Sequence, residues 1–115
     1  MGLRIRVLGS TAVWRDDIEV DLGGRRVREL LALLVAADGA TVPADVLAER
    51  LWRGEPPATA QSTLQGYILR LRRALEPGVS ARDAVVLQTR GSGYALDTAA
   101  VDIDAQRFLA AVSRA

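Results

Sequence analysis

The spacing of hydrophobic residues changes twice along this chain, and that change constrains the fold most strongly. Up to about residue 22, apolar and polar side chains alternate, which is typical of half-buried β-strands. From Gly23-Gly24 to about residue 75 the apolar side chains recur every three or four positions, as in helices that bury one face. Alternation returns over residues 85–96. With 115 residues there is room for one compact core, so the pattern predicts an α+β domain.

Turn-forming residues divide these regions into elements, since Gly, Pro, Asp and Ser interrupt each periodic run. Glycine is typical just after a helix, and proline of its first turn. The predicted elements are an antiparallel meander over residues 3–22, a helix between Gly24 and Gly39, a bridging strand at Thr41-Val42, a helix from Pro43 to Trp52, a helix over about residues 58–75, and a hairpin over residues 85–96.

The residue types that are missing exclude several kinds of chemistry. The chain contains no Cys, His, Lys or Asn. Without Cys and His, zinc and haem sites of the usual kind, disulfides, cysteine nucleophiles and Ser-His-Asp triads are excluded. The carboxylates cluster at residues 16–21 and 97–104 on polar faces, which argues against general acid catalysis. We therefore expect a protein that is not an enzyme and uses no cofactor or metal.

The hydrophobic runs are too short for a membrane segment. None reaches the roughly 18 residues that span a bilayer, and the first residues form an alternating strand where a signal peptide needs an apolar core. We expect a cytoplasmic protein with no membrane partner.

Positive charge is concentrated although the net charge is only +1. Residues 58–96 contain five Arg and two acidic residues, whereas residues 16–21 contain four acidic residues and no basic one. One end of the molecule is therefore expected to be positive and the other negative. A basic surface of this kind is typical of nucleic-acid binding.

The third predicted helix has one apolar and one polar face when it is projected at about 100° per residue. The apolar arc consists of Ala60, Leu64, Tyr67, Ile68, Leu71 and Leu75. The opposite arc, which we expect to be exposed, consists of Thr59, Ser62, Thr63, Gln65, Gly66, Arg70, Arg72 and Arg73. A meander, three helices and a hairpin in this order form a winged helix-turn-helix. Its third helix can enter a major groove and its hairpin, the wing, a minor groove.

Four motifs together resemble one family of winged helices. They are Leu22-Gly23-Gly24-Arg25-Arg26 before the leucine-rich residues 30–34, Leu51-Trp52, the run at residues 64–75, and Thr89-Arg90-Gly91-Ser92-Gly93-Tyr94. A Leu-Arg-Arg-Ala-Leu helix end followed by an Arg-Gly-x-Gly-Tyr wing resembles the OmpR/PhoB-type winged-helix domain. More closely, the chain resembles the version of this domain at the N-terminus of the Streptomyces antibiotic regulatory proteins, which act in secondary metabolism. The resemblance covers nearly the whole chain.

The resemblance implies a DNA-binding domain over residues 1–97, then a linker and the start of a bacterial transcriptional activation domain over residues 98–115. It implies a transcriptional activator that binds double-stranded DNA at promoter direct repeats as a head-to-tail homodimer. It also implies recruitment of RNA polymerase holoenzyme and no small-molecule ligand in this domain. The implied polymerase-contact loop consists of Arg53, Gly54, Glu55, Pro56 and Pro57.

The resemblance also implies individual DNA contacts. Arg70 suits bidentate recognition of guanine, and Arg90 in the wing suits a narrow minor groove. Response regulators often have His and Arg where Tyr67 and Leu69 stand, so their base preference does not transfer. The implied DNA-binding residues are Trp52, Ser62, Thr63, Gly66, Tyr67, Arg70, Arg72, Arg73, Thr89 and Arg90.

Other interpretations of these residues stay open. The helix arginines also suit a solvated helix face, and Arg90 suits a solubilising charge at a hairpin tip. Tyr67 and Trp52 also suit core packing, and Leu69 either a thymine methyl contact or a plain surface position. The alternative function is a winged helix that binds a protein through its meander or through residues 53–59, without specific DNA binding.

Overall fold

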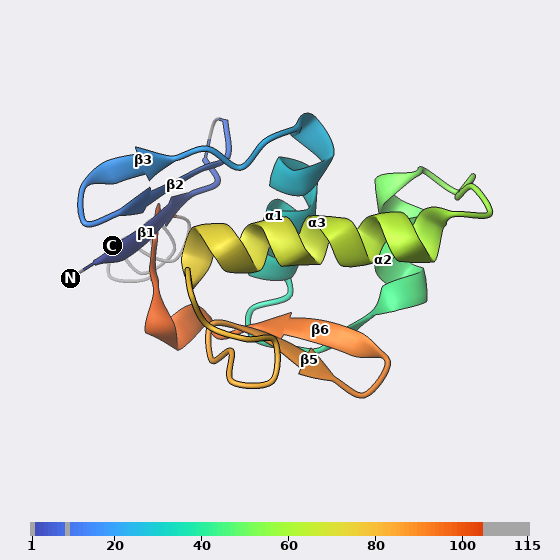
Figure 1. Cartoon of the computed structure of the whole chain (residues 1–115). Coiled ribbons are helices and arrows are strands. Elements are labelled where there is room, and N and C mark those ends of the chain that lie inside the picture. The colour runs from blue at the N-terminus through green and yellow to red at the C-terminus, as the bar shows by residue number, and fades with distance from the viewer. Residues whose placement is uncertain (1, 9, 105–115) are drawn as a thin grey trace, which may run out of the picture.

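The computed structural model describes residues 2–8 and 10–104. It has the predicted winged helix-turn-helix fold, with a four-stranded sheet, a group of three helices and a three-stranded sheet that carries the wing. Figure 1 shows the first sheet beyond the C-terminal end of the third helix and the wing along one side of that helix.

The meander consists of β1 (Leu3–Arg6), β2 (Ala12–Arg15) and β3 (Ile18–Val20), which pair antiparallel as predicted. Ile5 and Val13 are opposite each other in the register, and both are fully buried against the helices. Asp16 and Asp17 connect β2 to β3 with φ values of 52° and 67°. Tight hairpins need this left-handed backbone, and Asp tolerates it better than most residues.

A fourth strand joins this sheet from the other end of the sequence. After a short 3₁₀ helix, η1 (Thr98–Ala100), β7 (Asp102–Ile103) pairs parallel with β1 and completes the order β3-β2-β1-β7. Val101 and Ile103 are buried in the common core. Residues 98–104, the first part of the range predicted as a linker and the start of a further domain, form η1, β7 and Asp104, and Val101 and Ile103 belong to the hydrophobic core. The rest of that predicted range, residues 105–115, lies outside the described residues.

Asp104 attaches β7 to the end of β1. Its Oδ1 accepts a hydrogen bond from the Val7 N–H at 2.9 Å, and its Oδ2 accepts one from the Leu8 N–H at 3.1 Å. We expect Asp104→Ala to lower the free energy of unfolding by about 1 kcal/mol, because both bonds are lost at a partly exposed position. Urea denaturation measures this change. The matched control is Glu19→Ala on the exposed edge strand β3, and an equal loss in both variants would contradict the role of Asp104.

Three helices form the centre of the domain and pack against one another: α1 (Arg25–Ala36), α2 (Ala44–Leu51) and α3 (Ala60–Leu75). α2 begins one residue and α3 two residues later than predicted. No helix in the described part of the chain is long and apolar enough to cross a membrane. The buried leucines of the helices are Leu30, Leu31, Leu34, Leu47, Leu51, Leu64, Leu71 and Leu75.

The second sheet has the order β4-β6-β5, from β4 (Val42–Pro43), β6 (Gly93–Leu96) and β5 (Leu87–Arg90). β4 is the predicted bridging strand, shifted by one residue. β5 and β6 form the wing, and Arg90 pairs with Gly93 across a two-residue turn. Gly91 has a φ of 57° in this turn, which suits the first central position of a type II′ turn.

Candidate nucleic-acid interface

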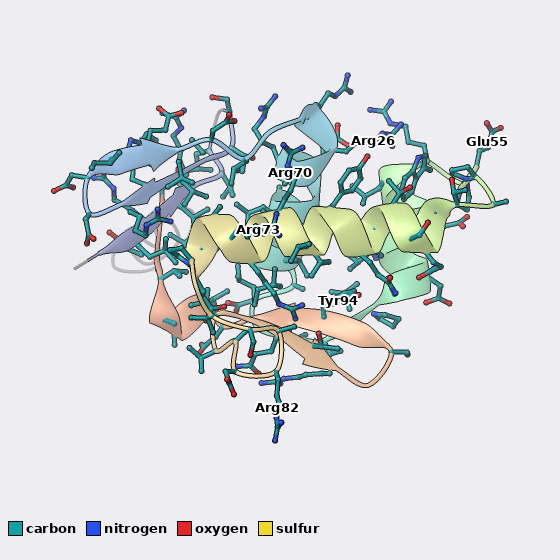
Figure 2. The ribbon with its side chains drawn as sticks, viewed as in Figure 1. Arg26, Glu55, Arg70, Arg73, Arg82 and Tyr94 are labelled. Atoms are coloured by element: carbon teal, nitrogen blue, oxygen red, sulfur yellow. The ribbon has the colours of Figure 1, made fainter. Side chains whose placement is uncertain are left out.

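α3 presents a polar face to solvent, flanked by the wing on one side and by Arg26 of α1 on the other (Figure 2). Gly66 has open space where a Cβ atom would lie. Among the described residues the two ion pairs are those of Arg4 with Asp17 and of Arg25 with Glu29, so the charges of Arg70 and Arg73 are not compensated. The exposed residues of this face are Ser62, Gln65, Gly66, Leu69, Arg70 and Arg73, with Thr63 and Tyr67 half-buried beside them.

Gln65 belongs to this face, although sequence reasoning assigned it no DNA contact. It is exposed one turn before Leu69. A glutamine amide can both donate to and accept from an adenine edge in the major groove. The signal was present in the sequence, because Gln65 lies on the predicted polar arc of α3.

Arg72 is buried, and the prediction that it lies on the exposed arc is wrong. Only 7% of the residue is exposed. Its Nε donates to the Leu87 carbonyl oxygen at 3.0 Å, and its Nη2 donates to Thr89 Oγ1 at 2.6 Å. The guanidinium carbon lies 6.0 Å from the centre of the Tyr94 ring. A helical projection of α3 by itself cannot show that β5 covers this flank of the helix. At this position Arg72 holds the wing against α3.

Glu76 makes a second connection between the end of α3 and the wing. The residue is 8% exposed, and its Oε1 and Oε2 accept hydrogen bonds from the N–H groups of Val85 at 2.8 Å and Leu87 at 3.0 Å. β5 is an edge strand, so its outward N–H and C=O groups need partners from outside the sheet. Glu76 and Arg72 supply them at Leu87. Sequence reasoning missed this role of Glu76, because its contacts lie 9 and 11 residues further along the chain.

The two predicted wing residues, Thr89 and Arg90, differ in the hydrogen bonds that their side chains already make within the domain. Arg90 is exposed at the end of β5, where its Nε and Nη2 donate to Gln88 Oε1 at 3.0 and 2.8 Å. The neutral amide leaves the positive charge of Arg90 uncompensated. The hydroxyl oxygen of Thr89 already accepts a hydrogen bond from Arg72.

Trp52 and Tyr67 come together on the flank of α3 away from the wing. Their rings are stacked at a centroid distance of 6.3 Å and an angle of 15°. The guanidinium carbon of Arg26 lies 5.1 Å from the centre of the Trp52 ring, and its Nη1 donates to the Leu51 carbonyl oxygen at 2.6 Å. Beside them is an open pocket of about 620 Å³ that also reaches Arg70. Sequence reasoning did not select Arg26, because its neighbours here belong to other helices.

The predicted polymerase-contact loop lies at the other end of α3 from the meander (Figure 1). Residues 53–59 are all exposed, and Glu55 points away from the body of the domain (Figure 2). Three backbone bonds shape the start of the loop: the Arg53 N–H donates to the Arg50 oxygen at 3.4 Å, the Gly54 N–H to the Glu49 oxygen at 2.8 Å and the Glu55 N–H to the Trp52 oxygen at 3.0 Å. The loop therefore projects into solvent from a start that backbone hydrogen bonds hold in one conformation.

Comparison with known proteins identifies the family of this fold. The family model described as "Transcriptional regulatory protein, C terminal" matches residues 17–96. The chain belongs to this OmpR/PhoB-type family. The predicted family is therefore confirmed.

Two regulators of Streptomyces are among the relatives of this OmpR/PhoB-type domain. Regulatory protein AfsR of Streptomyces coelicolor is 38% identical over 94 residues, which are 82% of this chain and 9% of the relative. Regulatory protein DnrI of Streptomyces peucetius is 33% identical over 110 residues, which are 92% of this chain and 40% of the relative. The chain thus spans less than half the length of either protein.

A solved structure supports the fold of the OmpR/PhoB-type domain. It is described as Mycobacterium tuberculosis EmbR in complex with a low-affinity phosphopeptide. The TM-score is 0.81 at 32% sequence identity, and the match covers 94% of this chain and 28% of the other.

In this OmpR/PhoB-type domain the predicted site residues form three groups. Ser62, Thr63, Gly66, Arg70 and Arg73 lie along α3; Trp52 and Tyr67 stack on one flank; Thr89 and Arg90 lie in the wing on the other flank. Arg72 belongs to none of these groups; it is buried between α3 and the wing and connects them through its hydrogen bonds to Leu87 and Thr89. The loop at residues 53–57 begins beside the second group, where Arg53 borders the same pocket as Trp52 and Tyr67, and Glu55 points away from it.

Proposed function

We propose that this domain binds double-stranded promoter DNA in a sequence-specific manner and belongs to a transcriptional activator. The observation that carries the proposal is the exposed polar face of α3, with uncompensated arginines, beside a wing that Arg72 and Glu76 hold in a fixed position. This arrangement suits a helix in the major groove and a hairpin at the minor groove.

Each group of residues has a distinct proposed task. The side chains along α3, with Arg70 and Gln65 as the strongest candidates, read base edges in the major groove. Arg90 reaches a narrow minor groove, and Trp52, Tyr67 and Thr89 lie against the sugar-phosphate backbone. Arg72 takes no direct part, because its guanidinium is bonded to the wing.

The proposed assembly is a head-to-tail homodimer on promoter direct repeats, and charge asymmetry supports it. The β2–β3 turn and the residues around it are acidic at positions 16–21, and they lie away from the wing (Figure 1). The exposed loop at residues 53–57, with Glu55 at its surface, is the proposed contact with RNA polymerase. Action on promoter DNA implies a cytoplasmic location.

The decisive test is selection of random duplexes by the purified domain at two salt concentrations. We expect a tandem repeat that is still enriched at the higher salt. With about four to six phosphate contacts, the logarithm of the binding constant should fall against the logarithm of salt concentration with a slope on the order of −4 to −5. Recovery of unselected DNA at low salt alone would contradict sequence-specific binding.

Arg70→Ala tests the proposed base contact. We expect a loss of about 1 to 3 kcal/mol in binding free energy on the selected duplex and a relaxed preference at one base pair. Arg50→Ala is the matched control, because it removes the same charge from an exposed position on α2. If Arg70→Ala weakens selected and random duplexes equally, Arg70 does not read a base.

A protein-binding winged helix is the second candidate, and one observation favours it. Ile18 is 72% exposed on β3, which is an edge strand of the first sheet. Edge strands with exposed apolar residues can pair with another chain. Absence of duplex binding at any salt concentration would favour this function.

A further inference from the structure

The pocket on the flank of α3 away from the wing is strongly basic, and we call it the Arg26 pocket. Its polar lining includes Arg26, Arg53, Arg70, Trp52 and Tyr67. Arg25 and Glu29 also border it, but they pair with each other at 2.9 Å. Within residues 2–8 and 10–104, no carboxylate lies within ion-pair distance of Arg26, Arg53 or Arg70. The pocket therefore carries unneutralised positive charge.

Two of its guanidinium groups are held in place without a ligand. Arg26 is fixed by the Leu51 carbonyl oxygen and the Trp52 ring, which leaves most of its five N–H donors for another partner. The Arg70 guanidinium lies against Gly23, where an added Cβ atom would be 2.7 Å from Arg70 Cζ. Gly23 also has a φ of 90°, so it both turns the chain and leaves space for Arg70. Guanidinium groups that are already held in one position lose little conformational entropy when they bind a ligand.

The position of the pocket indicates which anion it receives. The wing and the Arg26 pocket lie on opposite flanks of α3 (Figure 2). When α3 occupies a major groove about 12 Å wide, one sugar-phosphate backbone runs along each flank. The geometry points to a phosphate site: in the Arg26 pocket the guanidinium of Arg26 binds one backbone phosphate of the duplex, at the edge of the major groove away from the wing, while Arg70 at the α3 side of the pocket keeps its base contact. Guanidinium groups bind phosphate oxygens in pairs of parallel hydrogen bonds. This inference rests on the proposed function.

Arg26→Gln is the first test, because glutamine removes the charge and keeps a donor for the Leu51 oxygen. We expect affinity to fall about ten-fold on both the selected and a random-sequence duplex, with unchanged base preference. The salt slope should become shallower by about 0.9, the value for one lost phosphate contact. Arg50→Gln is the charge-matched control and should change neither quantity. Unchanged affinity and slope in Arg26→Gln, or a loss confined to the selected duplex, would overturn the site.

A second test does not depend on how well the variant folds. The wild-type domain is titrated with selected duplexes that each carry one uncharged methylphosphonate linkage. We expect one linkage on the flank away from the wing to weaken the wild-type domain, and the same linkage to have no further effect on Arg26→Gln. If every linkage on that flank is neutral for the wild-type domain, the inference is wrong while DNA binding stands.

The source of the phosphate is distinguished by titration with inorganic phosphate. We expect no saturable binding of the free ion, because the backbone phosphate is delivered by the contacts along α3. Tight binding of inorganic phosphate without duplex binding would overturn the inference. Failure of the wild-type domain to bind any duplex would instead remove the proposed function itself.

Discussion

Arg72→Met is expected to lower the free energy of unfolding by about 3 kcal/mol. Methionine keeps the apolar length of the side chain but leaves the buried Leu87 carbonyl oxygen without its donor. An unsatisfied buried acceptor costs about 1 to 3 kcal/mol, and the contact with the Tyr94 ring is lost as well. Urea denaturation of the isolated domain measures the change.

The same variant should also change DNA recognition in a specific way. Once Arg72 no longer holds the wing and only Glu76 does, we expect the preference for A·T-rich flanking sequence to weaken, since Arg90 in the wing is the proposed minor-groove contact. Thr89→Val is the graded control, because it removes only the 2.6 Å bond from Arg72. It should cost about 1 kcal/mol of stability. A stable Arg72→Met protein with an unchanged flank preference would show that Arg72 is not needed to position the wing.

Gly93→Ala should destabilise the domain by about 3 kcal/mol. A Cβ atom at this position would overlap the Val42 carbonyl oxygen and lie 2.9 Å from its carbon and 3.0 Å from Pro43 Cα. These are backbone atoms of the paired strand β4, so no side chain can rotate away and β4 must shift. The next bond along, from the Ala44 N–H to the Ser92 oxygen, attaches the wing to the start of α2 and would be strained too.

Gly66→Ala provides the matched comparison for Gly93→Ala, because the same atom is added where nothing lies within 4 Å. In the interior of a helix alanine is favoured over glycine by up to about 1 kcal/mol. We therefore expect a rise in melting temperature for Gly66→Ala and a fall for Gly93→Ala. Equal effects would show that the contact between β4 and β6 is not the cause.

The order of elements was predictable because the hydrophobic period differs so clearly between strands and helices. The change at Gly23-Gly24 marks the start of α1, and the glycines around Ser92 mark the turn of the wing. The exposed positions of Ser62, Gly66 and Arg73 also follow from the helical period alone. Local periodicity is sufficient wherever the neighbouring elements leave a face open.

The errors arise where partners far apart in the sequence decide the outcome. Arg72 has the same local pattern as Arg73, yet β5 covers one and leaves the other in solvent. Arg26 is a plain polar position of α1 until α2 brings Trp52 beside it. β7 was missed because two residues are too few for a periodic signal, and its pairing with β1 spans the whole domain.

The parallel pairing of β7 with β1 has a consequence for how this fold is used in longer proteins. The chain enters the domain at the start of β1 and, because β7 runs parallel to β1, leaves it at the other end of the same strand, beside Val7 and Leu8. In Figure 1 the sheet that contains both strands lies away from the wing and from the loop at residues 53–57. Further modules can therefore be joined at either end without obstructing the surface of α3. The matched region makes up 9% of one relative and 40% of another, so in those proteins it is joined to much longer chains.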